Sequence, residues 1–151
     1  MPENIKVVAT NRKAGFEYFL FDRFEAGLAL KGSEIKSIRA GQISLAESYI
    51  RVDEDQAWLI EAHIAPYIQA NRFNHDPKRP RRLLLHRKEI REMWDAVRQK
   101  GVTIVPVRVY LKNGRAKIEI GLAKGKQLHD KRASAKNKDW EREKARIMKH
   151  A

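Results

Sequence analysis

Cysteine is absent from this sequence of 151 residues. Disulfide bonds and thiolate metal sites are therefore excluded, and the absence fits a protein of the reducing cytoplasm. No apolar run approaches the roughly 18 residues that a membrane span requires. The first residues, MPENIKVVATNRK, lack the apolar core of a signal peptide. We therefore expect a cytoplasmic protein that does not bind a membrane.

Common catalytic signatures are also missing. The sequence has no HExxH, GxSxG or DxD motif and no Walker loop, and its 5 histidines are scattered. His129 and Asp130 are adjacent and could serve as the acid–base pair of a nuclease. Their segment contains too few apolar residues to hold a catalytic geometry. We expect no enzymatic activity, no metal site and no cofactor.

Positive charge, in contrast, is abundant. The sequence holds 32 lysines and arginines against 19 acidic residues, which gives a net charge of +13 and a pI near 10.2. The segment from Gly121 to Ala151 carries a net +6 of this charge, so the remainder is basic as well. Positive potential over both parts predicts a polyanionic partner such as a nucleic acid.

The end of the chain differs in character from the rest. Beyond Leu128 its large apolar residues are Trp140, Ile147 and Met148. Burying so few side chains cannot repay the entropy of ordering the backbone. We expect two parts: a folded basic domain over residues 1–123, and a basic tail over 124–151 that is disordered when free and helical on a partner.

Apolar periodicity and turn residues divide the first part into short strands and two helices. Strands are expected at 5–9, 16–24, 24–30, 44–52, 57–64 and 83–85, with a loop over 67–82. The clearer helix is expected at 86–100, where an apolar stripe recurs at helical spacing and Gly101 follows. That stripe consists of Ile90, Met93, Trp94 and Val97.

The other helix is expected from Gly32 to Gly41. Ser33 is a plausible N-cap, and Gly41 is a plausible stop. Lys36 and Arg39 are three residues apart, so they share one helix face. That face either binds an anion or is simply solvated.

A β-hairpin is predicted from Val102 to Ala123, because Asn113-Gly114 is typical of a type I′ turn. A two-residue loop sets the register. That register gives an apolar face with the pairs Val109–Ile118, Val107–Ile120 and Val105–Leu122, and a polar face with Lys112–Arg115, Arg108–Glu119 and Tyr110–Lys117. Pro106 lacks an amide donor, which predicts an edge strand or a bulge there.

Several polar positions near the start of the chain have two interpretations. Arg12 and Lys13 either lie in a solvated turn or contact phosphates. Glu25 either forms a surface ion pair or accepts hydrogen bonds from base amino groups or ribose hydroxyls. Gly27, inside a predicted strand, indicates a bulge or a close approach of two backbones.

The order of elements predicts a mainly β fold with short helices. A closed or partly open antiparallel barrel of the OB type, with five or six strands in Greek-key order, fits this order, and such barrels often bind oligonucleotides. An SH3-like barrel and an α+β sandwich are the alternatives. The fold alone does not establish a function.

Three stretches together resemble a known family. They are FEAGLALKGSEIKSIRAG, KRPRRLLLHRKEI and IGLAKGKQLHDKR, the last followed by a tail ending in DWEREKARIMK. In this order they resemble the SmpB family, the SsrA-binding proteins of bacterial trans-translation. The resemblance extends from about Asn11 to Lys149. Phe16 and Gln127 depart from it, since the family often has a histidine and a lysine at these two positions.

The resemblance implies an OB-like barrel that binds the tRNA-like domain of transfer-messenger RNA (tmRNA) and completes its likeness to a tRNA. The complex enters stalled ribosomes, where the tail becomes a helix in the empty mRNA channel near the decoding centre. Elongation factor Tu with GTP and alanyl-tRNA synthetase act through the RNA. One protein monomer per tmRNA is expected, and the protein performs no chemistry.

The resemblance also implies which residues contact RNA. The RNA-binding residues that it implies are Asn11, Glu25, Gly27, Lys36, Ser37, Arg39, Leu84, Lys124, Gly125, Lys126, His129, Asp130, Lys131 and Arg132. To these we add Arg12 and Lys13, the phosphate contacts considered above. The ribosome-engaging tail residues are Lys136, Lys138, Trp140, Lys144, Arg146, Ile147, Met148 and Lys149. Two other functions fit the composition: a ribosomal or ribosome-assembly protein, and an RNA-processing enzyme that uses His129.

Overall fold

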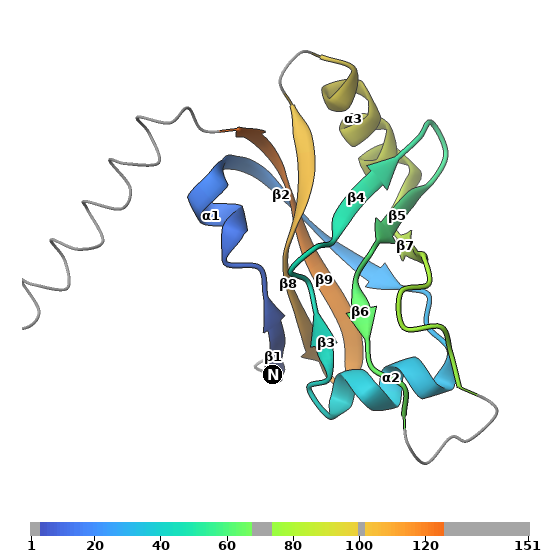
Figure 1. Cartoon of the computed structure of the whole chain (residues 1–151). Coiled ribbons are helices and arrows are strands. Elements are labelled where there is room, and N and C mark those ends of the chain that lie inside the picture. The colour runs from blue at the N-terminus through green and yellow to red at the C-terminus, as the bar shows by residue number, and fades with distance from the viewer. Residues whose placement is uncertain (1–3, 68–73, 100–101, 126–151) are drawn as a thin grey trace, which may run out of the picture.

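The computed structural model describes residues 4–67, 74–99 and 102–125 (Figure 1). Its helices are α1 (Lys13–Glu17), α2 (Gly32–Arg39) and α3 (Arg87–Arg98). Its strands are β1 (Ile5–Thr10), β2 (Tyr18–Leu28), β3 (Ile43–Ser44), β4 (Tyr49–Val52), β5 (Ala57–Ile60), β6 (His63–Ile64), β7 (Arg81–Leu84), β8 (Thr103–Lys112) and β9 (Arg115–Gly125).

The strands form an antiparallel sheet that curves into a partly open barrel, as the sequence predicted. Seven strands are hydrogen-bonded in the order β1-β8-β9-β2-β7-β5-β4, and β3 pairs separately with β6. The main sheet therefore has more strands than the five or six expected. The end strands β1 and β4 do not pair with each other, so the barrel stays open there. Figure 1 shows α2 at one end of the barrel and α3 at the other.

The core lies inside the barrel and is built from alternating strand residues. Val109, Ile118 and Ile120 on the hairpin and Leu59 on β5 are fully buried there. The apolar stripe of α3 faces this core: Ile90 and Met93 are buried, whereas Trp94 and Val97 are half-buried. No helix of the described residues is long and apolar enough to cross a membrane.

Four predicted strands have different limits in the structure. The two expected over 16–30 form the single long strand β2, preceded by the helix α1. The predicted strand over 44–52 is interrupted by a turn in which the Ser48 amide donates to the Leu45 carbonyl (3.1 Å). The one over 57–64 is interrupted at Glu61, whose φ of 62° does not continue a strand. Apolar periodicity therefore does not reveal short turns inside apolar stretches.

The β8–β9 hairpin confirms the predicted register near its turn. Asn113 and Gly114 have φ values of 51° and 81°, and the pairs from Lys112–Arg115 to Arg108–Glu119 form as predicted. Beyond Arg108 the register shifts by one residue, so that Pro106 lies opposite Ile120. The predicted bulge at Pro106 is confirmed. The edge position is wrong, because β8 lies between β1 and β9.

Helix α2 is attached to the barrel by buried polar groups. Its N-cap is Lys31, whose amide donates to Glu34 Oε1 (2.8 Å), and not Ser33 as predicted. Ser33 is buried, and its hydroxyl hydrogen-bonds His75 Nδ1 (2.8 Å). The predicted stop at Gly41 is confirmed, since this residue has a φ of +75°. The predicted stop at Gly101 lies outside the described residues.

Glu34 also binds two arginines that the sequence placed in a loop. Its Oε2 accepts from Arg81 Nε (2.6 Å), and its Oε1 accepts from Arg79. Arg81, the first residue of β7, donates further to the carbonyls of Ala62 (2.7 Å) and Pro77 (3.0 Å). Burial alone would raise the pKa of Glu34, but these donors hold it below its ordinary value. This network sets the position of α2 relative to β7.

Candidate nucleic-acid interface

A shallow groove runs along the outer face of the barrel, over β9, β2 and β7. One hollow of about 440 Å³ lies between β2 and the start of α3. A second of about 470 Å³ lies beside the hairpin turn and shares Glu25 and Lys117 with the first. The groove is lined mainly by Glu25, Gly27, Arg82, Leu84, His86, Lys112, Asn113, Arg115 and Lys117.

The floor of the groove is formed where β2 meets β7. Gly27 pairs with Leu84, and a Cβ on Gly27 would lie 3.2 Å from Leu84 Cβ. The predicted close approach is confirmed, and the register irregularity of β2 lies instead between Leu20 and Arg23. Leu84 was expected inside a buried strand, but its side chain is 52% exposed. It thus presents an apolar surface among cations.

Glu25 is held in place by neighbours on β8. The Tyr110 hydroxyl donates to its carboxylate, and Lys112 Nζ lies 3.3 Å from Oε1. The Tyr110 hydrogen bond is the main cause that lowers the pKa of Glu25, and Lys112 and Lys117 add to it. Burial and this carboxylate raise the pKa of Tyr110. Glu25 is therefore an ionised acceptor at the groove, and the predicted surface ion pair is confirmed.

A second carboxylate on this face, that of Glu119, is shared by two arginines. Glu119 accepts from Arg23 Nη1 (2.7 Å) and from Arg108 Nε (2.7 Å). Burial alone would raise the pKa of Glu119, but the two guanidinium groups lower it. Arg108 also lies over the Tyr110 ring, 5.2 Å from its centroid. The predicted polar face of the hairpin is thus an ordered charge network in which cations outnumber acids.

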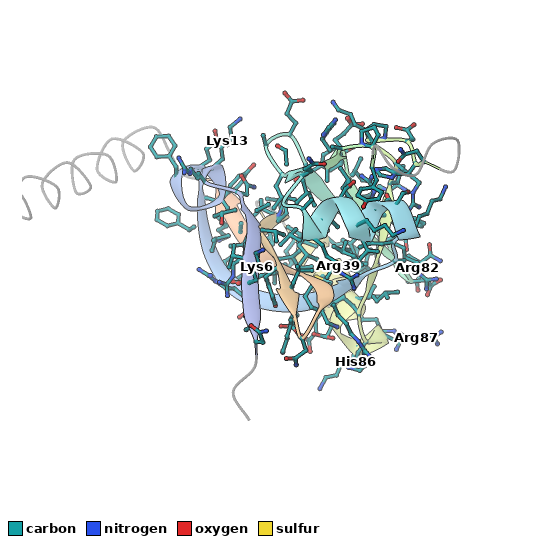
Figure 2. All side chains as sticks on the ribbon, turned by 90° about the horizontal axis from the view of Figure 1, so that it is seen from below. Lys6, Lys13, Arg39, Arg82, His86 and Arg87 are labelled. Atoms are coloured by element: carbon teal, nitrogen blue, oxygen red, sulfur yellow. The ribbon has the colours of Figure 1, made fainter. Side chains whose placement is uncertain are left out.

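Helix α2 adds cations at the hairpin end of the groove. Arg39 and Lys36 are exposed, and Arg39 Nη2 lies 3.4 Å from the Gly114 carbonyl. Figure 2 shows Arg39 at the hairpin, with Arg82 and His86 farther along. The Lys36 ammonium lies 5.6 Å from the centre of the Tyr67 ring. Ser37 is fully buried and donates to the Ala65 carbonyl (2.7 Å), so its side chain does not reach this surface.

A second group of predicted residues lies around α1. Arg12 and Lys13 are exposed and line a hollow of about 320 Å³ with Asn11 and residues 43–46. Asn11 Nδ2 donates to the Pro106 carbonyl (2.9 Å), so this side chain supports the β8 bulge. At the end of β9, Lys124 pairs with Phe19. Ala14 of α1 packs against Val105 and Ala123 there, and Gly125 pairs with Tyr18.

The residues expected on one RNA-binding face thus fall into two groups. Lys117 and Gly125 belong to the same strand, eight residues apart, which corresponds to about 26 Å. The other predicted residues lie outside the described part of the chain: Lys126, His129, Asp130, Lys131, Arg132, Lys136, Lys138, Trp140, Lys144, Arg146, Ile147, Met148 and Lys149. β9 also continues to Gly125, two residues beyond the expected domain boundary.

Six of the lining residues were not among the predicted contacts: Arg82, His86, Lys112, Asn113, Arg115 and Lys117. Tyr110, which binds Glu25, was not predicted either. The predicted hairpin register had already placed Tyr110 opposite Lys117 and Lys112 opposite Arg115 on the polar face. This pattern could have identified the groove residues that belong to the hairpin. Arg82 was hidden because the sequence assigned it to a loop. In the structure it belongs to β7 and points to the same face as Leu84.

Comparisons with known proteins agree with the motifs in the sequence. The family model described as SmpB protein matches residues 8–150. The SsrA-binding protein of Rhodopseudomonas palustris (strain BisB18) is 56% identical over 146 residues, which cover 96% of this chain and 93% of that protein. The SsrA-binding protein of Desulforudis audaxviator is 52% identical over 144 residues, covering 95% and 94%.

A solved structure has the same fold. It is described as "tmRNA-SmpB: a journey to the center of the bacterial ribosome", and the matched chain is 40% identical with a TM-score of 0.66. The match covers 85% of this chain and 87% of the solved one. The sequence motifs, the partly open barrel and these similarities lead to one conclusion: the chain belongs to the SmpB family of SsrA-binding proteins.

Proposed function

We propose that this protein binds tmRNA and acts with it in trans-translation, the rescue of ribosomes stalled on incomplete messages. The proposal rests on the groove over β9, β2 and β7 in a chain 56% identical to an SsrA-binding protein. The solved relative, described as tmRNA-SmpB in the bacterial ribosome, supports both the RNA and the ribosome as partners. The site of action would be the cytoplasm, where ribosomes translate.

The groove is suited to a folded RNA. Lys117, Arg82 and Lys112 supply cations for phosphates, while the ionised Glu25 can accept from a ribose hydroxyl or a base amino group. Leu84 offers an exposed apolar surface against which an unstacked base can pack. A tRNA-like domain provides such bases in its loops, and we assign that domain of tmRNA to the groove.

The group around α1 lies where the barrel meets the basic tail. Lys124 and Gly125 lead directly into the basic tail, and Arg12 and Lys13 lie beside them. We keep these four residues as RNA contacts, and we assign the tail residues to the ribosome, in the empty mRNA channel near the decoding centre. One protein monomer would accompany each tmRNA. Elongation factor Tu with GTP and alanyl-tRNA synthetase would act indirectly, through the same RNA.

The decisive experiment identifies the RNA that the protein carries. A tagged full-length protein is recovered from its own cytoplasm in moderate salt, and the bound RNA is sequenced. A Leu84→Asp variant serves as the matched control, because it places a carboxylate in the groove at a solvent-exposed position. We expect one dominant RNA with a tRNA-like end and a short reading frame, depleted in the variant. Ribosomal RNA in excess without such a species would contradict the proposal.

A further inference from the structure

Three residues on neighbouring strands form a straight row across β7, β5 and β4. Arg82 lies opposite Trp58, and Trp58 lies opposite Arg51. Residues that are opposite each other in an antiparallel sheet share a face, with Cβ atoms about 5 Å apart. Two arginines therefore flank one indole, and the strands that carry the two arginines are about 10 Å apart.

This row lies on the same face as the groove. Arg82 and Leu84 are two residues apart on β7, so both point to one side, and Leu84 faces Gly27 on the groove floor. The alternate residues Leu83, Leu59 and Ile50 are buried in the core on the other side. Arg82 also lines the groove itself. The row is thus a continuation of the groove surface toward β4.

The arginines of the row differ from those on the hairpin side. Arg23 and Arg108 are both bound to Glu119, whereas among the described residues no carboxylate pairs with Arg51 or Arg82. The Trp58 indole is half-buried and likewise has no hydrogen-bond partner there. Two uncompensated guanidinium groups on either side of β5 repel each other, and a polyanion would relieve this repulsion.

We propose that Arg51, Trp58 and Arg82 extend the tmRNA-binding surface across β7, β5 and β4. Trp58 stacks on an unpaired base, and the two arginines hold the phosphates on either side of it. Guanidinium groups bind phosphate in a bidentate manner, and stacking on an aromatic ring tolerates any base. The acidic turn at 53–55 follows Arg51 and sets the limit of this surface. The proposal rests on the proposed function.

Binding titrations of full-length variants with tmRNA test this surface. Because stacking contributes substantially, we expect Trp58→Leu to weaken binding about tenfold and Trp58→Phe to retain most of the affinity. Arg51→Ala should lower the slope of log affinity against log salt by about one unit. The control is Arg91→Ala, which removes an exposed arginine of α3 outside the row and should leave both quantities unchanged.

Fluorescence supplies a readout that a structural role for Trp58 would not change. In a variant with Trp94→Phe and Trp140→Phe, Trp58 is the remaining tryptophan, and tmRNA should quench its emission. The quenching measurement and the salt dependence of Arg51→Ala test the proposal even if Trp58→Leu does not fold. Wild-type affinity in the folded row variants, or unquenched emission, would overturn the proposal. If Leu84→Asp then still abolished binding, the proposed function would stand. Failure of the wild-type protein to bind tmRNA would overturn both.

Discussion

Arg81 and Glu34 form an ion pair that is completely removed from solvent. Arg81 Nε lies 2.6 Å from Glu34 Oε2, and both side chains have 0% exposure. Arg79 binds the other carboxylate oxygen, and the remaining Arg81 donors reach backbone carbonyls. The pair connects α2, which carries Lys36 and Arg39, to the strand that carries Arg82 and Leu84. It therefore couples the stability of the barrel to the geometry of the groove.

Removal of the Glu34 charge should strongly destabilise the protein. Glu34→Gln leaves Arg81 buried without a counter-ion, and breaking such a pair costs about 3–5 kcal/mol. The measurement is the free energy of unfolding in urea. The control is Asp95→Asn, which breaks the exposed pair with Arg98 (62% and 60% exposed) and should cost less than about 1 kcal/mol. Equal effects of the two substitutions would show that the buried pair has no special role.

The same pair makes a prediction for acid stability. The pKa of Glu34 is lowered in the folded protein from its ordinary value of 4.5. Its contribution to stability is therefore fully present above pH 4.5 and is lost as the pH falls through the folded-state value. The unfolding free energy of the wild type should decrease in this acidic range, and that of Glu34→Gln should decrease less. Parallel pH profiles for the two proteins would contradict this.

Tyr110 should act on RNA binding through Glu25. Tyr110→Phe removes the hydrogen bond that does most to lower the pKa of Glu25, so this pKa should rise toward 4.5. Carbon-13 NMR of the carboxyl group during an acid titration measures this rise. Tyr49→Phe alters an exposed tyrosine on β4 and should leave the titration unchanged. We also expect the Tyr110→Phe variant to bind tmRNA more weakly, since Glu25 is then less well held.

Gly27→Ala should weaken tmRNA binding without a comparable loss of stability. The added Cβ would lie 3.2 Å from Leu84 Cβ, which forces Leu84 to shift by a few tenths of an ångström together with its backbone. Loss of glycine flexibility in the unfolded chain offsets part of this cost by about 0.4–1 kcal/mol. We expect a nearly unchanged melting temperature and weaker tmRNA binding. Gly32→Ala, with no atom within 4 Å of its added Cβ, is the control. Unchanged tmRNA affinity would remove Gly27 from the interface.

The division of the chain into a binding barrel and a ribosome-engaging tail predicts the effect of truncation. A protein ending at Arg132 keeps the whole groove, so its affinity for tmRNA should stay within a few-fold of the wild type. Tagging of a nonstop message in a reconstituted translation system should be abolished. Loss of tmRNA binding in this truncated protein would show that the division is wrong.

Local sequence patterns predicted the structure correctly where residues that are close in the sequence determine it. The Asn113-Gly114 turn set the hairpin register up to Arg108 because a two-residue loop leaves one way to pair the strands. Helical spacing of apolar residues predicted α3, and the missing amide hydrogen of Pro106 predicted the bulge. The family motifs also identified Glu25, Gly27 and Leu84, which lie together in the groove.

Pairing between distant segments decided the rest. β2 lies between β9 and β7, so Gly27 meets Lys117 on one side and Leu84 on the other, and no local pattern contains this information. The same pairing exposes Leu84, buries Arg81 beside Glu34 and separates the predicted residues into two groups. The sequence by itself thus determined the family, the charge and the local elements. Only the tertiary structure decided which cations share a surface, because strand order in a sheet depends on long-range contacts.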